Sequence, residues 1–117
     1  MAPKGSERFP KSARLRKRTE FVQLARYGSK VHSGHFVVIV QSNEAKESRL
    51  GITVSAKVGN SVVRNRIKRQ VREYFRRHRA KLPKATDFLV IARSTAATLA
   101  SELIAREIER AMAPGRA

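Results

Sequence analysis

The order of apolar and polar residues predicts several β-strands. Residues 31–41 are rich in β-branched side chains around the apolar run 36–40, and Ser33-Gly34 can divide this segment in two. Residues 50–54 alternate apolar with small or polar side chains, and residues 88–92 form a further apolar run. Short runs of this kind, bounded by turn residues, are typical of strands. We therefore expect a sheet built from these segments.

Apolar residues that recur every three or four positions predict a helix near each end of the chain. The first would begin at an N-cap Thr19 and stop at Gly28. At about two turns it is too short to be stable alone, so it must dock on the rest of the protein. Its apolar face would consist of Phe21, Val22, Leu24 and Ala25. The last helix would end at Pro114-Gly115, with an apolar face of Leu99, Leu103, Ile104, Ile108 and Met112.

Residues 61–80 predict a longer helix of a different character. At about 100° per residue, its apolar side chains fall on one stripe that would pack on the sheet. The stripe consists of Val63, Ile67, Val71, Tyr74 and Phe75. Most of the remaining circumference is cationic, with Asn65 near its centre, and holds Arg64, Arg66, Lys68, Arg69, Arg72, Arg76, Arg77 and Arg79. Arg66 and Arg69 are far from the stripe, so we expect replacement of either by Ala to weaken RNA binding and to leave folding intact.

Strands mixed with helices in a chain of 117 residues predict a single α/β domain, a two-layer sandwich over residues 14–113. Residues 1–13 contain two prolines, a glycine and no apolar periodicity, which predicts a disordered basic tail. Residues 114–117 would form a short C-terminal tail. The longest apolar run is far shorter than the ~20 residues that span a bilayer, and no secretory signal is visible. We therefore expect a cytoplasmic protein.

The charge of the chain points to a function. There are 26 Lys and Arg against 9 Asp and Glu, a formal net charge of +17. Residues 1–30 and 57–81 carry nearly all of this charge, whereas residues 31–56 are balanced. Two basic blocks indicate a face that binds a polyanion, and the guanidinium groups of the second can grip phosphate oxygens through two donors. The first block contributes the RNA-binding candidates Arg14, Arg16, Lys17 and Arg18.

Few residues favour a metal or a catalytic site in the protein itself. The chain has no cysteine, which excludes disulfides and thiolate zinc sites. His32 and His35 would point to opposite faces of a strand, so we expect no structural metal. Asp87 is the only aspartate and has no paired carboxylate nearby in the sequence. In the last helix Glu102, Glu107 and Glu109 are expected at the surface, with Arg106 and Arg110 as local partners.

Residues 57–73 resemble the signature of the protein subunit of bacterial ribonuclease P. They read KVGNSVVRNRIKRQVRE, a Lys-x-Gly stretch that leads into a helix with Arg-Asn-Arg, then Lys-Arg and Arg. A lone Arg-Asn-Arg would be a weak signal, but the extended pattern is specific. The resemblance covers roughly residues 14–112.

The resemblance implies a fold and a function. The fold is an α/β sandwich of order αβββαβα, in which the basic helix joins parallel strands through a left-handed crossover, an exception to the usual handedness. The function is that of the protein subunit of a ribonucleoprotein that cleaves the 5′ leader from precursor tRNA. In that assembly the active site lies on the catalytic RNA, which holds most of the Mg2+, and the protein alone binds no cofactor. The protein would bind this RNA and the leader, raise substrate affinity and lower the Mg2+ requirement, without a membrane or an obligate protein partner.

The resemblance also assigns residues to two surfaces. The catalytic RNA would be held by Arg64, Asn65, Arg66, Lys68, Arg69, Arg72 and Arg76. The leader would lie in a cleft between the first helix and the sheet, lined by Phe21, Phe36 and Lys57, although both aromatic residues could instead be core. Three positions depart from the family. Many members have an aromatic residue in place of Ala25, and some have Tyr in place of Ile39 and Lys in place of Ala56. Since stacking contributes about 1–3 kcal/mol per base, we expect a leaner leader site here.

Composition alone would also fit a ribosomal or general RNA-binding protein with no part in an enzyme. Small, very basic proteins without cysteine are typical of ribosomes. The pattern over residues 57–73 favours the ribonuclease P subunit instead. A helix-turn-helix DNA-binding protein is disfavoured, because the basic helix has no companion helix at turn spacing.

Overall fold

The computed structural model describes residues 14–15, 17–43 and 47–112, so Arg16 and the two predicted tails lie outside the described residues. The elements are α2 (Arg18–Tyr27), β1 (Ser29–Ser33), β2 (Phe36–Ser42), β3 (Arg49–Thr53), α3 (Ser61–His78), η2 (Arg79–Lys81), β4 (Thr86–Ala92), η3 (Ser94–Thr98) and α4 (Ser101–Met112). Apart from the short 3-10 turns η2 and η3, this is the order that the resemblance implies. Among the described helices, none is long and apolar enough to cross a membrane.

The four strands form one mixed sheet in the order β1-β2-β4-β3. β1 and β2 form an antiparallel hairpin, β2 pairs with β4 in antiparallel fashion, and β3 pairs with β4 in parallel. Parallel neighbours cannot be joined by a tight turn, and here α3 makes the connection. The left-handed sense of this crossover stays a prediction of the resemblance.

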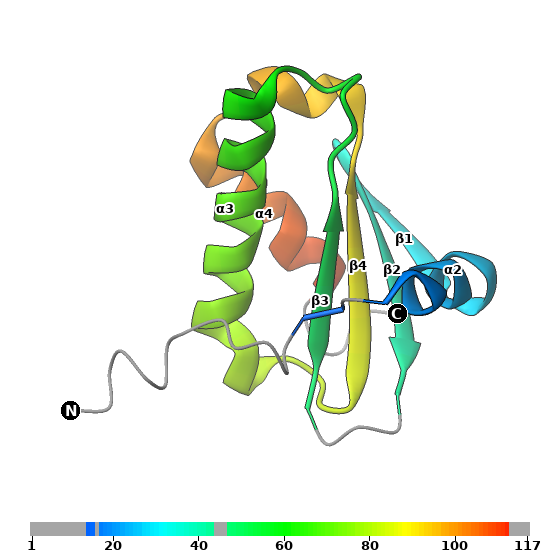
Figure 1. Cartoon of the computed structure of the whole chain (residues 1–117). Helices are drawn as coiled ribbons and strands as arrows, with labels where there is room; N and C mark the ends of the chain where they lie inside the picture. Colours follow the sequence, from blue (N-terminus) through cyan, green and yellow to red (C-terminus); the bar gives the residue numbers. More distant parts are fainter. Residues whose placement is uncertain (1–13, 16, 44–46, 113–117) are drawn as a thin grey trace.

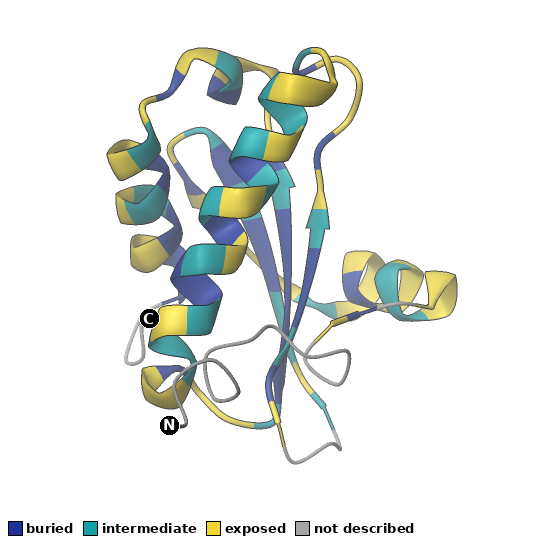
Figure 2. Ribbon diagram, turned by 60° about the vertical axis from the view of Figure 1, so that its left-hand side comes forward, coloured by how far each residue is buried: buried dark blue, intermediate teal, exposed yellow. Residues whose placement is uncertain are grey.

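Helices lie on both faces of the sheet (Figures 1 and 2), and the sheet separates two apolar clusters. α3 and α4 cover one face, where the larger cluster includes Phe36, Ile67, Phe75, Phe88 and Ile104. α2 lies on the opposite face, over a smaller cluster of Leu15, Leu24, Ile39 and Leu89. The predicted α/β sandwich is therefore confirmed, and α2 adds a partial third layer to it.

Alternation along β2 decides which aromatic residue can face α2. Phe36 and Val38 belong to the cluster under α3 and α4, whereas Ile39 packs under α2. Successive side chains of a strand point to opposite faces, so residues three apart cannot line the same cleft. Phe36 is 0 % exposed. The expectation that Phe36 lines a leader cleft beside Phe21 is therefore wrong, and Phe36 is a core residue.

The apolar stripe predicted for the basic helix is confirmed. α3 begins after the N-cap Asn60, whose Oδ1 accepts a hydrogen bond from the Val63 N–H (3.0 Å). The buried residues of α3 are Ile67, Val71, Tyr74 and Phe75. Phe75 meets Phe88 of β4 edge to face, with ring centroids 6.3 Å apart. Because this stripe is fixed on the sheet, the opposite side of α3 is held toward solvent.

The start of α2 differs from the prediction, and its end agrees with it. The N-cap is Lys17 rather than Thr19, and the Lys17 backbone N–H donates to Glu20 Oε1 (3.1 Å). The helix ends at Gly28, whose N–H donates to Leu24 O (2.9 Å). The carboxylate of Glu20 in the first turn thus satisfies the backbone N–H of the N-cap residue, as in one half of a capping box.

The apolar faces predicted for the two short helices are narrower in the structure. In α2 only Leu24 is buried, Phe21 is half-buried, and Val22 and Ala25 are exposed. In α4 Leu103 is exposed, while Ile104, Ile108 and Met112 are buried as expected. Leu99 is buried but precedes the helix.

The β1–β2 hairpin is attached to α4 through Glu107. Gly34 in the turn has a φ of 56°, a left-handed conformation that favours glycine. Glu107 accepts a hydrogen bond from the His35 backbone N–H (2.8 Å) and lies 3.0 Å from His35 Nδ1. Ser33 Oγ donates to the Glu107 carbonyl oxygen (2.7 Å). Glu107 therefore joins two elements instead of pairing with the arginines of its own helix, and His35 lies in the turn rather than on a strand.

We expect Phe36→Ala to lower the free energy of unfolding by about 3–5 kcal/mol, because the substitution leaves a ring-sized cavity in the core. Phe21→Ala should cost clearly less, because that side chain is only half-buried. Urea unfolding followed by circular dichroism measures both. Equal losses for the two variants would contradict this placement of the rings.

Candidate nucleic-acid interface

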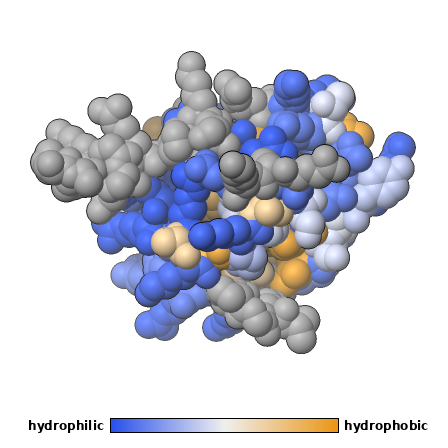
Figure 3. Space-filling view, turned by 90° about the horizontal axis from the view of Figure 1, so that it is seen from below, coloured by the Kyte–Doolittle hydropathy of each residue, from blue (hydrophilic) through white to orange (hydrophobic). Residues whose placement is uncertain are grey.

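The outer side of α3 carries the residues that we call the basic face, namely Arg64, Asn65, Arg66, Lys68, Arg69, Arg72 and Arg76. Asn65, Arg69 and Arg72 are exposed, and the others are half-buried. Figure 2 shows exposed positions along the side of α3 that is turned away from the sheet. Hydrophilic residues dominate the view from below, in Figure 3. The structure thus gathers the predicted RNA-binding residues of α3 on one surface.

Two arginines of the basic face are tied to backbone oxygens. Arg64 Nε donates to Gly59 O (3.1 Å). Arg66 Nη2 donates to Ala97 O (3.1 Å), and Arg66 Nη1 lies 3.4 Å from Ser101 Oγ. Arg66 therefore links α3 to η3 and to the first residue of α4. Distance from the apolar stripe is therefore not enough to predict that replacing Arg66 leaves folding intact, because its long side chain reaches across to this neighbouring segment.

Glu73 neutralises the C-terminal part of the basic face. Arg76 donates to both of its carboxylate oxygens, and Arg77 Nε lies 3.6 Å from Oε1. The hydrogen bond from Arg76 is the main cause that lowers the pKa of Glu73, and the charge of Arg77 adds to it. Glu73 is therefore ionised at neutral pH and holds Arg76 in place.

The middle of the basic face keeps its positive charge. Within the part of the chain that the structure describes, Lys68, Arg69 and Arg72 make no ion pair with an acidic side chain. Crowded like charges repel one another and destabilise the compact protein unless an anion binds. The three side chains are thus available to a polyanion.

Two surface depressions meet at Arg72. The first is lined by Asn65, Arg69, Arg72, Glu73 and Arg76. The second, which we call the β3-edge depression, is lined by Arg14, Leu15, Phe21, Leu50, Gly51, Ile52, Lys68 and Arg72. Arg72 lines both. The surface expected to hold the catalytic RNA therefore lies next to the depression that contains Phe21, the residue expected to contact the leader.

Phe21 lies against the backbone of β3 at Gly51. A Cβ atom at Gly51 would lie only 2.8 Å from Phe21 Cε1, so the ring approaches this closely because residue 51 is glycine. One part of Phe21 packs on the cluster under α2, and another part lines the β3-edge depression beside Lys68 and Arg72. An aromatic ring next to two cations can stack a base while its phosphates are held.

The other predicted residues are spread more widely. Lys57 is exposed in the turn between β3 and α3 and does not line the β3-edge depression. Arg14 is exposed and does line it. Lys17 and Arg18 are exposed at the start of α2, and Arg16 lies outside the described residues. The N-terminal basic run thus borders the depression at Arg14 and α2 at Arg18.

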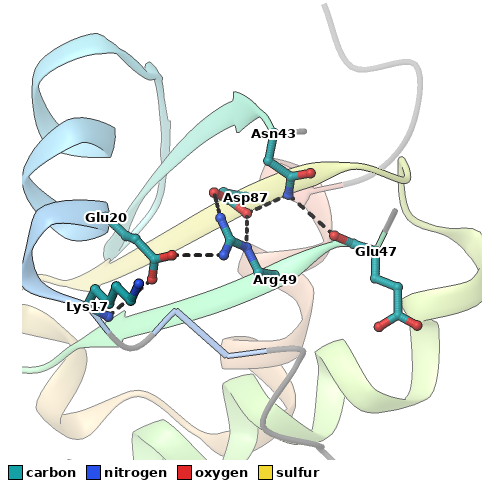
Figure 4. Close-up of polar contacts among 6 residues, drawn as sticks. All are labelled: Lys17, Glu20, Asn43, Glu47, Arg49 and Asp87. Atoms are coloured by element: carbon teal, nitrogen blue, oxygen red, sulfur yellow. Dashed lines mark hydrogen bonds and ion pairs between the residues drawn. The ribbon is translucent and has the colours of Figure 1, made fainter. Parts of the chain in front are cut away.

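An ion-pair network that the sequence does not reveal holds α2 on the sheet, and we call it the Arg49 network (Figure 4). Arg49 of β3 donates to both carboxylate oxygens of Asp87 in β4 (2.9 and 2.8 Å) and to Glu20 Oε2 of α2 (2.9 Å). Asn43 Nδ2 adds a bond to Asp87 Oδ1 (2.6 Å). The hydrogen bond to Asp87 is the main cause that raises the pKa of Arg49 above its ordinary value. Since Glu20 precedes Phe21, the network fixes the helical turn that carries the ring.

Only the register of the sheet could have revealed this network. Arg49 and Asp87 are far apart in sequence and lie directly opposite each other in the parallel β3–β4 pair. Asp87 is buried, and a buried carboxylate is stable only when its oxygens are paired. A lone buried aspartate therefore requires a cation nearby, and Arg49 is that cation.

The basic face does not fit a Mg2+ ion. Mg2+ takes oxygen ligands, chiefly carboxylates and waters, whereas the side chains here are guanidinium and ammonium groups. Glu73, the one carboxylate of the first depression, is already bound by Arg76. Among the described residues, no group of three or more His, Asp or Glu side chains could hold a metal.

Comparison with known proteins gives a consistent result. Residues 9–114 match the family model for ribonuclease P. The ribonuclease P protein component of Desulfosudis oleivorans is 45% identical over 105 residues, which cover 90% of this chain and 84% of that protein. The component of Desulfatibacillum aliphaticivorans is 42% identical over 105 residues, 90% of this chain and 89% of that protein.

Solved structures agree with this match. The RNase P protein of Staphylococcus aureus superposes with a TM-score of 0.81 at 38% identity, covering 86% of this chain and 93% of that one. The RNase P protein of Thermotoga maritima gives a TM-score of 0.74 at 34% identity, covering 81% and 90%. The likeness therefore extends well beyond residues 57–73.

We expect Arg49→Met to lower the free energy of unfolding by about 3 kcal/mol, because it leaves the buried Asp87 carboxylate without its cation. The double variant Arg49→Met/Asp87→Asn removes both charges and should recover part of that loss. Urea unfolding at neutral pH measures the two single variants, Arg49→Met and Asp87→Asn, and the double variant. If the two single losses simply add in the double variant, the residues are not coupled and the network does not act as a joint.

Proposed function

The chain belongs to the family of ribonuclease P protein components, and from this membership we propose that it is the RNA-binding subunit of a ribonuclease P ribonucleoprotein. The family consists of subunits of an endoribonuclease that processes tRNA. The subunit would bind a catalytic RNA and precursor tRNA with its 5′ leader, in the cytoplasm. It would raise the affinity for substrate and lower the Mg2+ requirement.

The position of the basic face next to the β3-edge depression carries this proposal. Arg72 lines the depression on α3 and also the one that contains Phe21. The catalytic RNA bound to α3 and the single-stranded leader at Phe21 would therefore lie next to each other. An aromatic ring beside cations is suited to binding a single strand, which supports a leader contact next to the surface proposed for the catalytic RNA.

The basic face suits contacts that position an RNA rather than read its sequence. Phosphate contacts fix register and orientation, whereas base edges carry the sequence. Lys68, Arg69 and Arg72 project from a helix that is fixed on the sheet, so their charges keep a constant spacing. We assign these three residues the main contacts with the catalytic RNA, with Asn65 and Arg76 at the border.

The leader contact would depend mainly on Phe21. A strand that crosses the edge of β3 could stack a base on this ring, with its phosphates near Lys68 and Arg72. Ala25 has no ring to add, and Ile39 is buried under α2. Because mature tRNA lacks a leader, the subunit would favour the precursor.

Hydrolysis itself is proposed to take place on the RNA subunit. RNA phosphates would hold the Mg2+ ions that activate the attacking water, since the basic face does not fit such an ion. The protein's part is to neutralise phosphates that crowd around the substrate. Fewer free cations are then needed to screen them, which explains a lower Mg2+ requirement.

Reconstitution tests the proposal directly. The protein should stimulate 5′ maturation of precursor tRNA by a bacterial ribonuclease P RNA at a Mg2+ concentration where the RNA alone is nearly inactive. Polylysine at equal charge serves as the control for simple neutralisation. If the protein does no better than polylysine, it is a general RNA-binding protein and the proposal fails.

Arginine substitutions separate the RNA-binding role from the structural one. Arg69→Ala should weaken binding to the catalytic RNA without changing the free energy of unfolding, because Arg69 is exposed and unpaired among the described residues. In a plot of the logarithm of the binding constant against the logarithm of the salt concentration, each lost phosphate contact should make the slope shallower by roughly 0.7 to 0.9. Arg66→Ala should lower stability as well, because it removes the bonds to Ala97 and Ser101.

Arg106→Ala is the matched control, since Arg106 is exposed on α4, outside the basic face. Filter binding over a range of salt concentrations and urea unfolding give both quantities for each variant. An equal loss of binding for Arg106→Ala and Arg69→Ala would show that total charge, rather than the basic face, determines the affinity.

A further inference from the structure

The outer side of α2 carries exposed apolar side chains that the proposed function does not use. Tyr27 is 65% exposed and Val22 is 47% exposed, although both lie on a helix that docks on the sheet through its other side. Leu24 is the buried residue of this helix, and Glu20 is held in the Arg49 network. The outer side is therefore a second surface of the same helix, distinct from the side on which Phe21 lines the β3-edge depression.

These side chains line a depression together with two arginines. Its lining residues are Arg18, Thr19, Val22, Gln23, Arg26 and Tyr27. Residues four apart lie above one another on a helix, so two parallel rows form here, Arg18-Val22-Arg26 and Thr19-Gln23-Tyr27. None of the lining residues is acidic. In the described part of the chain, neither arginine makes an ion pair with a carboxylate.

This combination has the chemistry of a site for single-stranded RNA. An aromatic ring stacks on a base, and guanidinium groups beside it hold phosphates. The two arginines and the absence of a lining carboxylate favour an anionic strand over a protein segment. Gln23, between the cations and the ring, can donate and accept hydrogen bonds with a base or a ribose hydroxyl.

We propose that the outer side of α2 binds a second stretch of the single-stranded 5′ leader, farther from the cleavage site than the nucleotides at Phe21. The argument rests on the proposed function, because it takes the leader to pass Phe21. Phe21 and Val22 are adjacent in sequence and lie on different sides of α2, and Arg18, the last residue of the N-terminal basic run, begins the outer row. A strand that leaves the β3-edge depression therefore meets the outer side of α2 next. Leaders too short to go past Phe21 do not reach this site.

The test uses the assembled ribonucleoprotein and precursor tRNAs whose leaders increase in length. Tyr27→Ala should weaken binding of long-leader precursors by about fivefold or more, the lower end expected for one stacked base, and leave the shortest leaders unchanged. Tyr27→Phe should bind like the parent, because the ring remains. Arg26→Gln should weaken the long leaders selectively and make their salt dependence shallower. Leu103→Ala, which removes another exposed apolar side chain on α4, is the control and should have no effect.

The sequence permits a direct observation of stacking. The chain has no Trp and two Tyr, so Tyr74→Phe leaves Tyr27 as the only tyrosine. Tyr74 is buried and close in shape to Phe, and circular dichroism checks that the variant is folded. A single-stranded oligonucleotide with the leader sequence should quench the fluorescence of Tyr27 in this variant. Absence of quenching at saturating oligonucleotide would overturn the proposal.

Other outcomes separate this inference from the proposed function. If the parent stimulates cleavage and prefers long leaders but Tyr27→Ala behaves identically, the outer side of α2 is not the second leader site. If Tyr27→Ala weakens assembly with the catalytic RNA, or abolishes self-association of the protein, the surface has another occupant and the inference is wrong. If the parent itself fails to stimulate cleavage, the proposed function fails.

Discussion

The burial of one stripe of α3 on the sheet determines most other properties of this protein. Ile67, Val71 and Phe75 are fully buried between the strands and the helix, and a helix fixed by such a stripe can neither rotate nor slide. The opposite side is therefore held outward with all of its cations. Repulsion among them cannot be relieved by movement of the helix, so it remains as a driving force for binding an anion. The core thus creates the basic face.

The second helix of the interface is attached by weaker means. α2 buries only Leu24 fully, which contributes about 1.5–3 kcal/mol at most, so polar contacts have to complete its attachment. The Arg49 network supplies them through Glu20 and Asp87. Because Arg49 and Asp87 are cross-strand neighbours in β3 and β4, the parallel pairing that α3 makes possible also positions α2. The two parts of the proposed RNA surface therefore depend on the same strand pair.

Periodicity made much of this fold predictable, and long-range contacts limited the rest. The stripe of α3, the hairpin break at Gly34 and the strand over residues 88–92 follow from local spacing. Phe36 shows the limit of this prediction. The family resemblance placed it in the leader cleft, whereas the alternation of side chains along β2 places it in the core. Arg66 shows another limit, since its bonds to η3 and to the start of α4 depend on how distant segments pack. The basic face was predictable as a set of charges, but which charges stay unpaired was not.

The distribution of acidic residues explains why those charges stay unpaired. Among the described acidic side chains, Glu20 and Asp87 join α2 and β4 to Arg49, and Glu107 joins α4 to the hairpin. Glu47 holds Arg79 after α3, and Glu73 holds Arg76 near its end. Each of these five carboxylates thus lies at a joint between elements or near the end of the basic helix, and the remaining described ones, Glu102 and Glu109, are exposed on α4. Among the residues that the structure describes, none of these carboxylates pairs with a cation in the middle of α3. Lys68, Arg69 and Arg72 are therefore left without acidic partners at the place where the RNA is proposed to bind.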